Sequence, residues 1–136
     1  MPDTIQAVDY FYTITPDKPG EACRALDTLK AAGVNLLAFS GFPSGRKSQL
    51  DFVPADPQAF LAVAKKAKLK LSRRKSCFLI QGDDRVGAVC ENLAKLAAAK
   101  INITAIDAVS AGMGRFGVIL WVKPRDQKRA AKALGL

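Results

Sequence analysis

The stretch DKPGEACRALDTLKAAGVNL, residues 17–36, decides the fold, because the chain repeats it 67 residues later as DRVGAVCENLAKLAAAKINI, residues 84–103. A repeat of this kind indicates two copies of one structural unit. Residues kept in both copies show what the unit needs, either for folding or for function. The pairs at equal positions include Asp17 and Asp84, Gly20 and Gly87, Cys23 and Cys90, Leu26 and Leu93, Leu29 and Leu96, and Asn35 and Asn102.

The composition is that of an ordinary globular chain. Its 136 residues suit one domain or two very small ones, and the hydrophobic fraction is 49%. No apolar run approaches the length of a membrane span, and the N-terminus lacks a secretion signal, so we expect a cytoplasmic protein with no membrane partner. Three cysteines without C-x-x-C spacing and no histidine predict no metal site and no cofactor. Cys23 and Cys90 fall on apolar helical stripes, which predicts reduced and mostly buried thiols.

The net charge of +9 is unevenly placed along the sequence. Residues 1–67 hold seven Lys or Arg and seven Asp or Glu, whereas residues 68–136 hold fourteen and five. Such asymmetry can mark a surface for nucleic acid or for an acidic partner. The alternative is a solvated face that only aids solubility.

The pattern of each copy predicts the element order βαββαβ. In the first copy we expect Asp17 to cap the first helix, Pro19 to lie in its first turn and Gly33 to end it in a left-handed conformation. The second copy lacks a final strand, and either its sheet is one strand short or the residues before Val8 fill the gap. The predicted strands are 6–15, 34–42, 48–53, 69–71, 76–81, 102–110 and 116–122; the predicted helices follow Asp17, begin at Pro57, and span 86–99 and 125–133.

The D-[KR]-P-G sequence after a strand, the leucine-rich helix and the following G-V-N-L resemble an ACT domain, twice in tandem. Val86 and Lys100 depart from the pattern in the second copy, where the first has proline and glycine. The resemblance implies an α+β fold of two ferredoxin-like βαββαβ units, paired side by side, each an antiparallel sheet with helices on one face. We place the units at residues 1–72 and 73–136. It also implies a homodimer and a small effector, such as an amino acid, bound where units pair.

The chemistry of the motif is consistent with that effector. Unpaired N–H groups at a helix N-terminus suit a carboxylate, and glycine allows close approach. An Asn side chain offers a donor and an acceptor, and an Asp can hold an ammonium. The purely structural interpretation is that the acids cap helices, the glycines serve packing and the asparagines form turns. The candidate ligand-binding residues are Asp17, Gly20, Asn35, Leu36, Asp84, Gly87, Asn102 and Ile103.

Other signals are weaker. Residues 112–117 match G-x-G-x-x-G, but a strand follows instead of a helix, which predicts a hairpin and no dinucleotide site. Without histidine a Cys or Ser nucleophile lacks its usual base, so we expect no enzyme. We expect a regulatory sensor acting on an unknown partner. The alternatives are a purely structural dimerisation module and, with less support, a nucleic-acid-binding protein using the cluster Lys68, Lys70, Arg73, Arg74 and Lys75.

Overall fold

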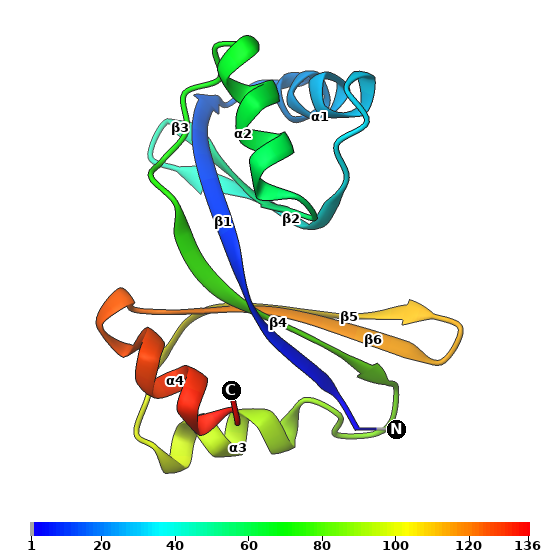
Figure 1. Cartoon of the computed structure of the whole chain (residues 1–136), viewed down its shortest axis with the longest axis vertical. Helices are drawn as coiled ribbons and strands as arrows, with labels where there is room; N and C mark the ends of the chain where they lie inside the picture. Colours follow the sequence, from blue (N-terminus) through cyan, green and yellow to red (C-terminus); the bar gives the residue numbers. More distant parts are fainter. Residues whose placement is uncertain (1) are drawn as a thin grey trace. The chain divides into compact units, whose positions relative to one another are not determined.

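The structure is a computed structural model, and it describes residues 2–136. This part of the chain forms two compact units. The first unit is Asp9–Lys75, and the second unit combines residues 2–8 with residues 76–136. Each is an α+β unit with an antiparallel sheet and two α-helices on one face, as the sequence predicts (Figure 1). No helix among the described residues is both long and apolar enough to cross a membrane.

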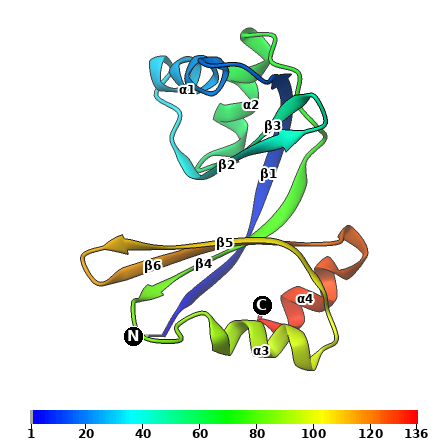
Figure 2. The same cartoon turned by 180° about the vertical axis from the view of Figure 1, so that it is seen from behind.

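The first unit follows the predicted order from the first strand to the second helix, with the sheet order β2-β3-β1. Both helices lie on the same face of this sheet (Figures 1 and 2). Strand β1 is long, and its residues from Asp9 onward belong to this unit. The elements are β1 (Thr4–Pro16), α1 (Glu21–Ala31), β2 (Leu36–Ser44), β3 (Lys47–Pro54) and α2 (Pro57–Lys66).

Three phenylalanines centre the core of the first unit. Phe11 of β1 lies opposite Phe52 of β3 in the sheet register. Phe60 of α2 stacks on Phe11 and lies tilted against Phe52, with ring centroids 5.4 Å from each. All three side chains are fully buried. Aromatic pairs at this separation add to the stabilisation from burial, so they fix α2 on the sheet.

The short strand predicted at residues 69–71 is not formed as a strand, although the chain does run beside β1 there. The Ser72 amide donates to the Tyr12 carbonyl at 2.8 Å, and the Thr13 hydroxyl donates to the Lys70 carbonyl at 2.6 Å. These few bonds close the sheet edge with an irregular segment.

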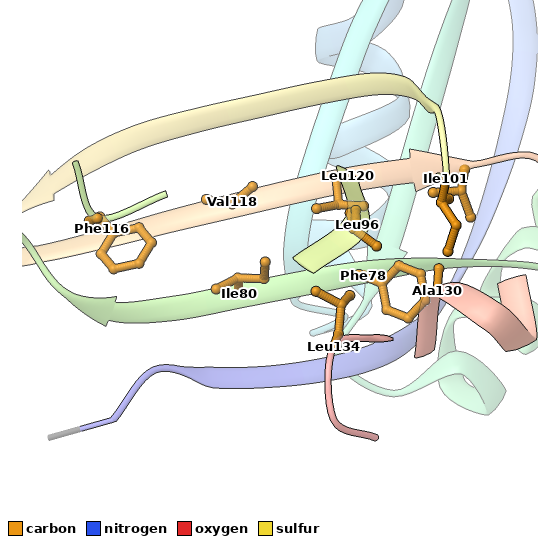
Figure 3. Packing of buried hydrophobic residues seen from close by; sticks show 11 residues of the cluster. Phe78, Ile80, Leu96, Ile101, Phe116, Val118, Leu120, Ala130 and Leu134 are labelled. Carbon is orange, nitrogen blue, oxygen red and sulfur yellow. The ribbon is translucent and has the colours of Figure 1, made fainter. Parts of the chain in front are cut away.

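The second unit repeats the layout, with β4, β6 and β5 adjacent in that order and α3 and α4 on one face (Figure 2). Its core side chains come from the inner face of β4 and β6 and from both helices (Figure 3). Phe78, Ile80 and Leu120 are fully buried there against Leu96 of α3 and Ala130 of α4. The elements are β4 (Lys75–Asp83), α3 (Cys90–Ala98), β5 (Ile103–Gly112), β6 (Arg115–Val122), a 3-10 turn (Pro124–Asp126) and α4 (Gln127–Ala133).

Residues 2–8 belong to the second unit, although they come first in the sequence. They place the start of β1 next to β4, and Ile5 packs against the second core. Of the two possibilities that the sequence left open, the structure shows the second: the residues before the first copy supply the missing strand.

The helices begin differently from the prediction. Asp17 does not cap α1, because the cap position is Gly20, with a φ of 93° and no side-chain cap bond. Pro19 therefore precedes the helix. Helix α3 begins at Cys90, four residues later than Val86, since Gly87 has a φ of 74° and interrupts the helical conformation.

The helix ends share one geometry. After each of the four α-helices, one residue adopts a left-handed conformation, and the next amide bonds back to the last turn. Gly33 has this role after α1, with a φ of 73°, which confirms the predicted C-cap. Lys68 and Lys100 have it after α2 and α3, with φ of 58° and 57°, where glycine is usually found.

Candidate functional site

The loop before α3 opens into a hollow of about 280 Å³ on the helix face of the second unit. Two of the predicted residues, Asp84 and Gly87, lie on its wall. The opposite wall comes from the end of β5 and the start of β6. The lining residues are Asp84, Arg85, Gly87, Ala88, Val89, Cys90, Ala108, Val109, Ser110 and Phe116.

Hydrogen bonds hold Asp84 against the β5–β6 hairpin. Its amide donates to the Gly114 carbonyl at 2.8 Å, and its carboxylate accepts from the Ser110 hydroxyl at 3.1 Å. The carboxylate is therefore engaged by the hairpin and does not cap α3. It remains exposed, so it can also accept a hydrogen bond from a ligand ammonium.

Arg85 supplies a cation on the wall of the same hollow. Both of its terminal nitrogens bond to the Asp3 carboxylate, and one also donates to the Asp83 carbonyl at 2.8 Å. Its guanidinium lies over the Phe116 ring, 5.9 Å from the centroid. The Asp3 hydrogen bond raises the pKa of Arg85 above its usual value. The guanidinium is thus held in place and charged.

The N-terminal end of α3 closes the hollow. Amides in the first turn of a helix have no partner within the helix, and they favour an anion. Gly87 adopts the left-handed conformation that a residue with a side chain rarely takes, and a Cβ there would meet only Cys90 Sγ, at 3.9 Å. Gly87 is therefore needed for the backbone conformation of this turn and not to make room for a neighbouring atom. Two amides here are already bonded, that of Ala88 to the Arg85 carbonyl at 3.1 Å and that of Cys90 to the Gly87 carbonyl at 3.0 Å. The remaining amides of this end, together with Asp84 and Ser110, offer groups for a carboxylate and an ammonium.

In the first unit the equivalent loop is tied down by a different contact. The Asp17 carboxylate accepts from the Ser48 hydroxyl at 3.0 Å. Gly20 is open to solvent, and a Cβ built on it would have no neighbour within 4 Å. Both predicted residues are exposed, and Glu21 beyond them pairs with Lys18 and Arg24.

Asn35 and Leu36 lie at the other end of α1. They line a separate hollow of about 350 Å³, together with residues from the last turns of that helix. The Asn35 carbonyl accepts from the Ala55 amide at 3.0 Å, and its side chain is exposed. The full lining is Leu26, Leu29, Lys30, Gly33, Val34, Asn35 and Leu36.

Within one unit, therefore, the two groups of predicted residues stand at opposite helix ends. Helix α1 has 11 residues, which is a length of about 16 Å. In the second unit Asn102 and Ile103 likewise follow α3, whereas Asp84 and Gly87 precede it. Asn102 is exposed, and Ile103 packs partly against the core. One amino acid cannot touch both ends of one such helix.

Several residues of the hollow were not predicted from the sequence. Ser110, Phe116 and Arg85 all contribute, but the first two have no identical counterpart in the first copy, so the repeat gave no signal for them. The prediction for Cys23 and Cys90 was wrong: both are exposed, Cys90 on the wall of the hollow, and only Cys77 is buried. No group of metal-binding side chains occurs among residues 2–136.

Comparison with solved structures places the fold. The chain is similar to protein BT0572 from Bacteroides thetaiotaomicron, with a TM-score of 0.77 and 14% identity over 97% of this chain and 99% of that one. It is also similar to the regulatory subunit of aspartate kinase from Thermus thermophilus in a ligand-free form, with a TM-score of 0.63 and 16% identity over 97% and 93%. The corresponding subunit from Thermus flavus gives a TM-score of 0.60 and 16% identity over 98% and 95%.

No family model matches the sequence, and no curated protein sequence matches it. At these identities the likeness is one of fold. It extends over nearly the whole length of both chains, and the solved relatives include regulatory subunits. The resemblance inferred from the two D-[KR]-x-G segments is confirmed at that level: the chain has the fold of the aspartate kinase regulatory subunits.

Proposed function

We propose that this chain is a non-catalytic regulatory protein that binds an amino acid or a similar small effector. The observation that carries the proposal is the hollow at the start of α3. It brings Asp84, the Ser110 hydroxyl and the first turn of a helix to one place, and Val109 and Phe116 supply an apolar wall. A zwitterion with a small apolar side chain matches this combination of groups.

The proposed binding mode assigns one group to each end of the ligand. The amides at the start of α3 bind the carboxylate, and the Asp84 carboxylate accepts from the ammonium. The volume of about 280 Å³ is just below the usual range for ligand pockets, roughly 300–1,000 Å³. This size favours a metabolite over a dinucleotide.

The remaining candidate residues complete the site in the assembled protein. We propose that Asn35, Leu36, Asn102 and Ile103 act from a paired unit of a second copy in a homodimer, because each lies at the far end of its own helix. An effector held in this way binds one dimer arrangement better than another. Such coupling amounts to about 1–3 kcal/mol in typical systems. A regulated partner protein then responds to the change.

The regulatory assignment has support of two kinds. Two solved structures of similar fold are regulatory subunits of aspartate kinase, and a third is assigned as a C-terminal regulatory domain of that enzyme. Within the hollow, the Cys90 thiol has no neighbouring histidine to act as a base, since the chain contains none.

Thermal unfolding with each of the twenty amino acids at millimolar concentration tests the proposal. A ligand at a hundred times its dissociation constant adds about 2.7 kcal/mol of stability. We expect at least one amino acid to raise the midpoint by several degrees, and Asp84→Asn to abolish that shift. The matched control is Asp107→Asn, which removes the same charge from an exposed position of β5 outside the hollow. A panel without a responder, or a response unchanged by Asp84→Asn, contradicts the proposal.

A further inference from the structure

The excess positive charge lies mainly on the first unit, contrary to the distribution along the sequence. Residues 9–75 carry twelve Lys or Arg and six Asp or Glu, a net +6. Residues 2–8 and 76–136 carry nine and six, a net +3. The reason is the stretch from Lys65 to Lys75, which has seven cations and no acid and which the structure assigns to the first unit. We call this stretch the basic segment.

Two cations of the basic segment have structural roles. Arg74 pairs with Asp9 at 2.9 Å and lies over the Phe11 ring. Lys75 lies over the rings of Tyr10 and Tyr12. The other five are exposed, and none forms an ion pair with a described residue: Lys65, Lys66, Lys68, Lys70 and Arg73. Their backbone groups take part in the turn after α2 and in the irregular edge segment, but no ion pair among the described residues holds their side chains.

A shallow groove adjoins the basic segment. It lies between the last turns of α1 and α2 and has a volume of about 460 Å³. Its floor is made of small apolar side chains, and Lys66 belongs both to its wall and to the basic segment. Asp27 of α1 lies one turn before the groove residue Ala31, and its carboxylate accepts a hydrogen bond from the Cys23 thiol at 3.6 Å. The lining residues are Thr28, Ala31, Ala32, Ala62, Val63, Lys66 and Ala67.

Lys68 places one cation of the basic segment directly after the end of α2. It occupies the left-handed position after α2, with a φ of 58°, whereas the same position after α1 is Gly33. Glycine would relieve the backbone there, yet the chain has a lysine whose side chain is exposed.

We propose that the groove and the basic segment together form a docking surface for an acidic amphipathic peptide segment of a partner protein. The apolar residues of such a segment cover the alanines and Val63, and its carboxylates meet Lys65, Lys66 and Lys68. Charge complementarity identifies the partner as acidic. The apolar floor favours a peptide over nucleic acid for two reasons. Alanine side chains form no favourable contact with phosphate groups, and the described residues that line the groove include no aromatic side chain on which a base could stack.

Selection from a displayed library of random 14-residue peptides against the immobilised chain tests this inference without assuming a sequence. We expect enriched peptides that combine Asp or Glu with apolar residues at helical spacing. An enriched peptide, made synthetically with a fluorophore, should bind the wild type and lose about tenfold or more in affinity with Ala62→Asp or Lys66→Glu. Enrichment of basic peptides, or no enrichment, overturns the proposal.

Matched variants separate docking from general charge effects. Ala97→Asp on the exposed face of α3 and Lys128→Glu on α4 make the same changes in the second unit, and both should leave the affinity unchanged. A labelled 20-nucleotide RNA and a poly-glutamate peptide serve as polyanion probes. If either probe binds as tightly as the enriched peptide, and its affinity is unchanged by Ala62→Asp, the surface binds polyanions in general and the docking proposal is wrong. None of these four positions lines the α3 hollow, so we expect the variants to leave amino-acid binding there unchanged, and the two proposals fail separately.

Discussion

The Asp3 carboxylate accepts hydrogen bonds from both terminal nitrogens of Arg85, at 3.2 and 3.3 Å, although the two residues are 82 positions apart in the sequence. Asn92 of α3 donates to the same carboxylate at 3.3 Å. Gly82 makes room for it, because a Cβ there would collide with the carboxylate and lie 2.8 Å from the Phe116 ring. The N-terminal strand is thereby fastened to the loop that forms the candidate site.

Loss of this contact should destabilise the second unit. The Asp3 side chain is 10% exposed and that of Arg85 40%, so we expect Asp3→Ala to cost about 1–2 kcal/mol, below the value for a fully buried pair. Urea unfolding followed by the fluorescence of Trp121, the one tryptophan and a residue of β6, measures it. Asp9→Ala, which removes a more exposed ion pair with Arg74, is the control and should cost less. Equal losses would refute the fastening role.

The repeat allowed most of the fold to be predicted from the sequence, because helical stripes and strand patterns are local signals. The origin of the fourth strand of the second unit could not be predicted, since residues 2–8 reach it by a contact distant in sequence. The late start of α3 was missed for a related reason. The helical pattern continues through Val86, but Gly87 is left-handed and Asp84 is bonded to the hairpin at Ser110.

The candidate site was predicted in part. Asp84 and Gly87 lie together because they share one loop, whereas Asn35 and Asn102 lie beyond the helices that follow those loops. Arg85 was part of the motif, but its orientation depends on Asp3, and nothing in the local pattern indicates that partner.

The two left-handed lysines should be sites of stabilising substitution. Lys68 and Lys100 have φ of 58° and 57°, and glycine there should add about 0.5–1 kcal/mol to the free energy of unfolding. Ala97→Gly, within the exposed face of α3, is the control and should lower it by roughly 1 kcal/mol. Chemical denaturation of the three variants measures the effect. Destabilisation by both lysine substitutions would show that the side chains contribute more than the backbone strain costs.

Asp51 should make stability depend on pH. The side chain is 5% exposed, and burial raises the pKa of Asp51 above 3.8, opposed by the hydrogen bond from Gln49 and the charge of Lys75. Stability from this group is therefore present below pH 3.8 and is lost as the pH rises through the folded pKa. We expect Asp51→Asn to be more stable than the wild type at pH 7, and the difference to shrink toward pH 4.

Melting curves of both proteins between pH 4 and 8 provide the measurement. Asp107→Asn, at an exposed position of β5, controls for the loss of one negative charge. A lower midpoint for Asp51→Asn at pH 7 would mean that the attraction to Lys75 outweighs the cost of burial.

The exposed edge of β5 should support the proposed homodimer. Val109 is 66% exposed and Ile106 37%, and β5 is an edge strand within the described residues. A lysine on an edge strand opposes pairing with another chain. We therefore expect the wild type to sediment as a dimer and Val109→Lys as a monomer. Met113→Lys changes a hairpin residue outside the strand that is still more exposed than Val109, and it should leave the dimer intact. A monomeric wild type would contradict the pairing.

The most direct test of the sensor proposal follows individual residues. Amide NMR spectra of the ¹⁵N-labelled chain are recorded while each amino acid is added in turn. At 14.6 kDa the chain is small enough for assignment of individual amides. The account predicts that one class of amino acid shifts the amides of Gly87, Ala88, Val89 and Ser110, and that Asp84→Asn removes these shifts while Asp107→Asn keeps them. Spectra unchanged by all twenty, or shifts confined to residues away from the α3 hollow, would contradict it.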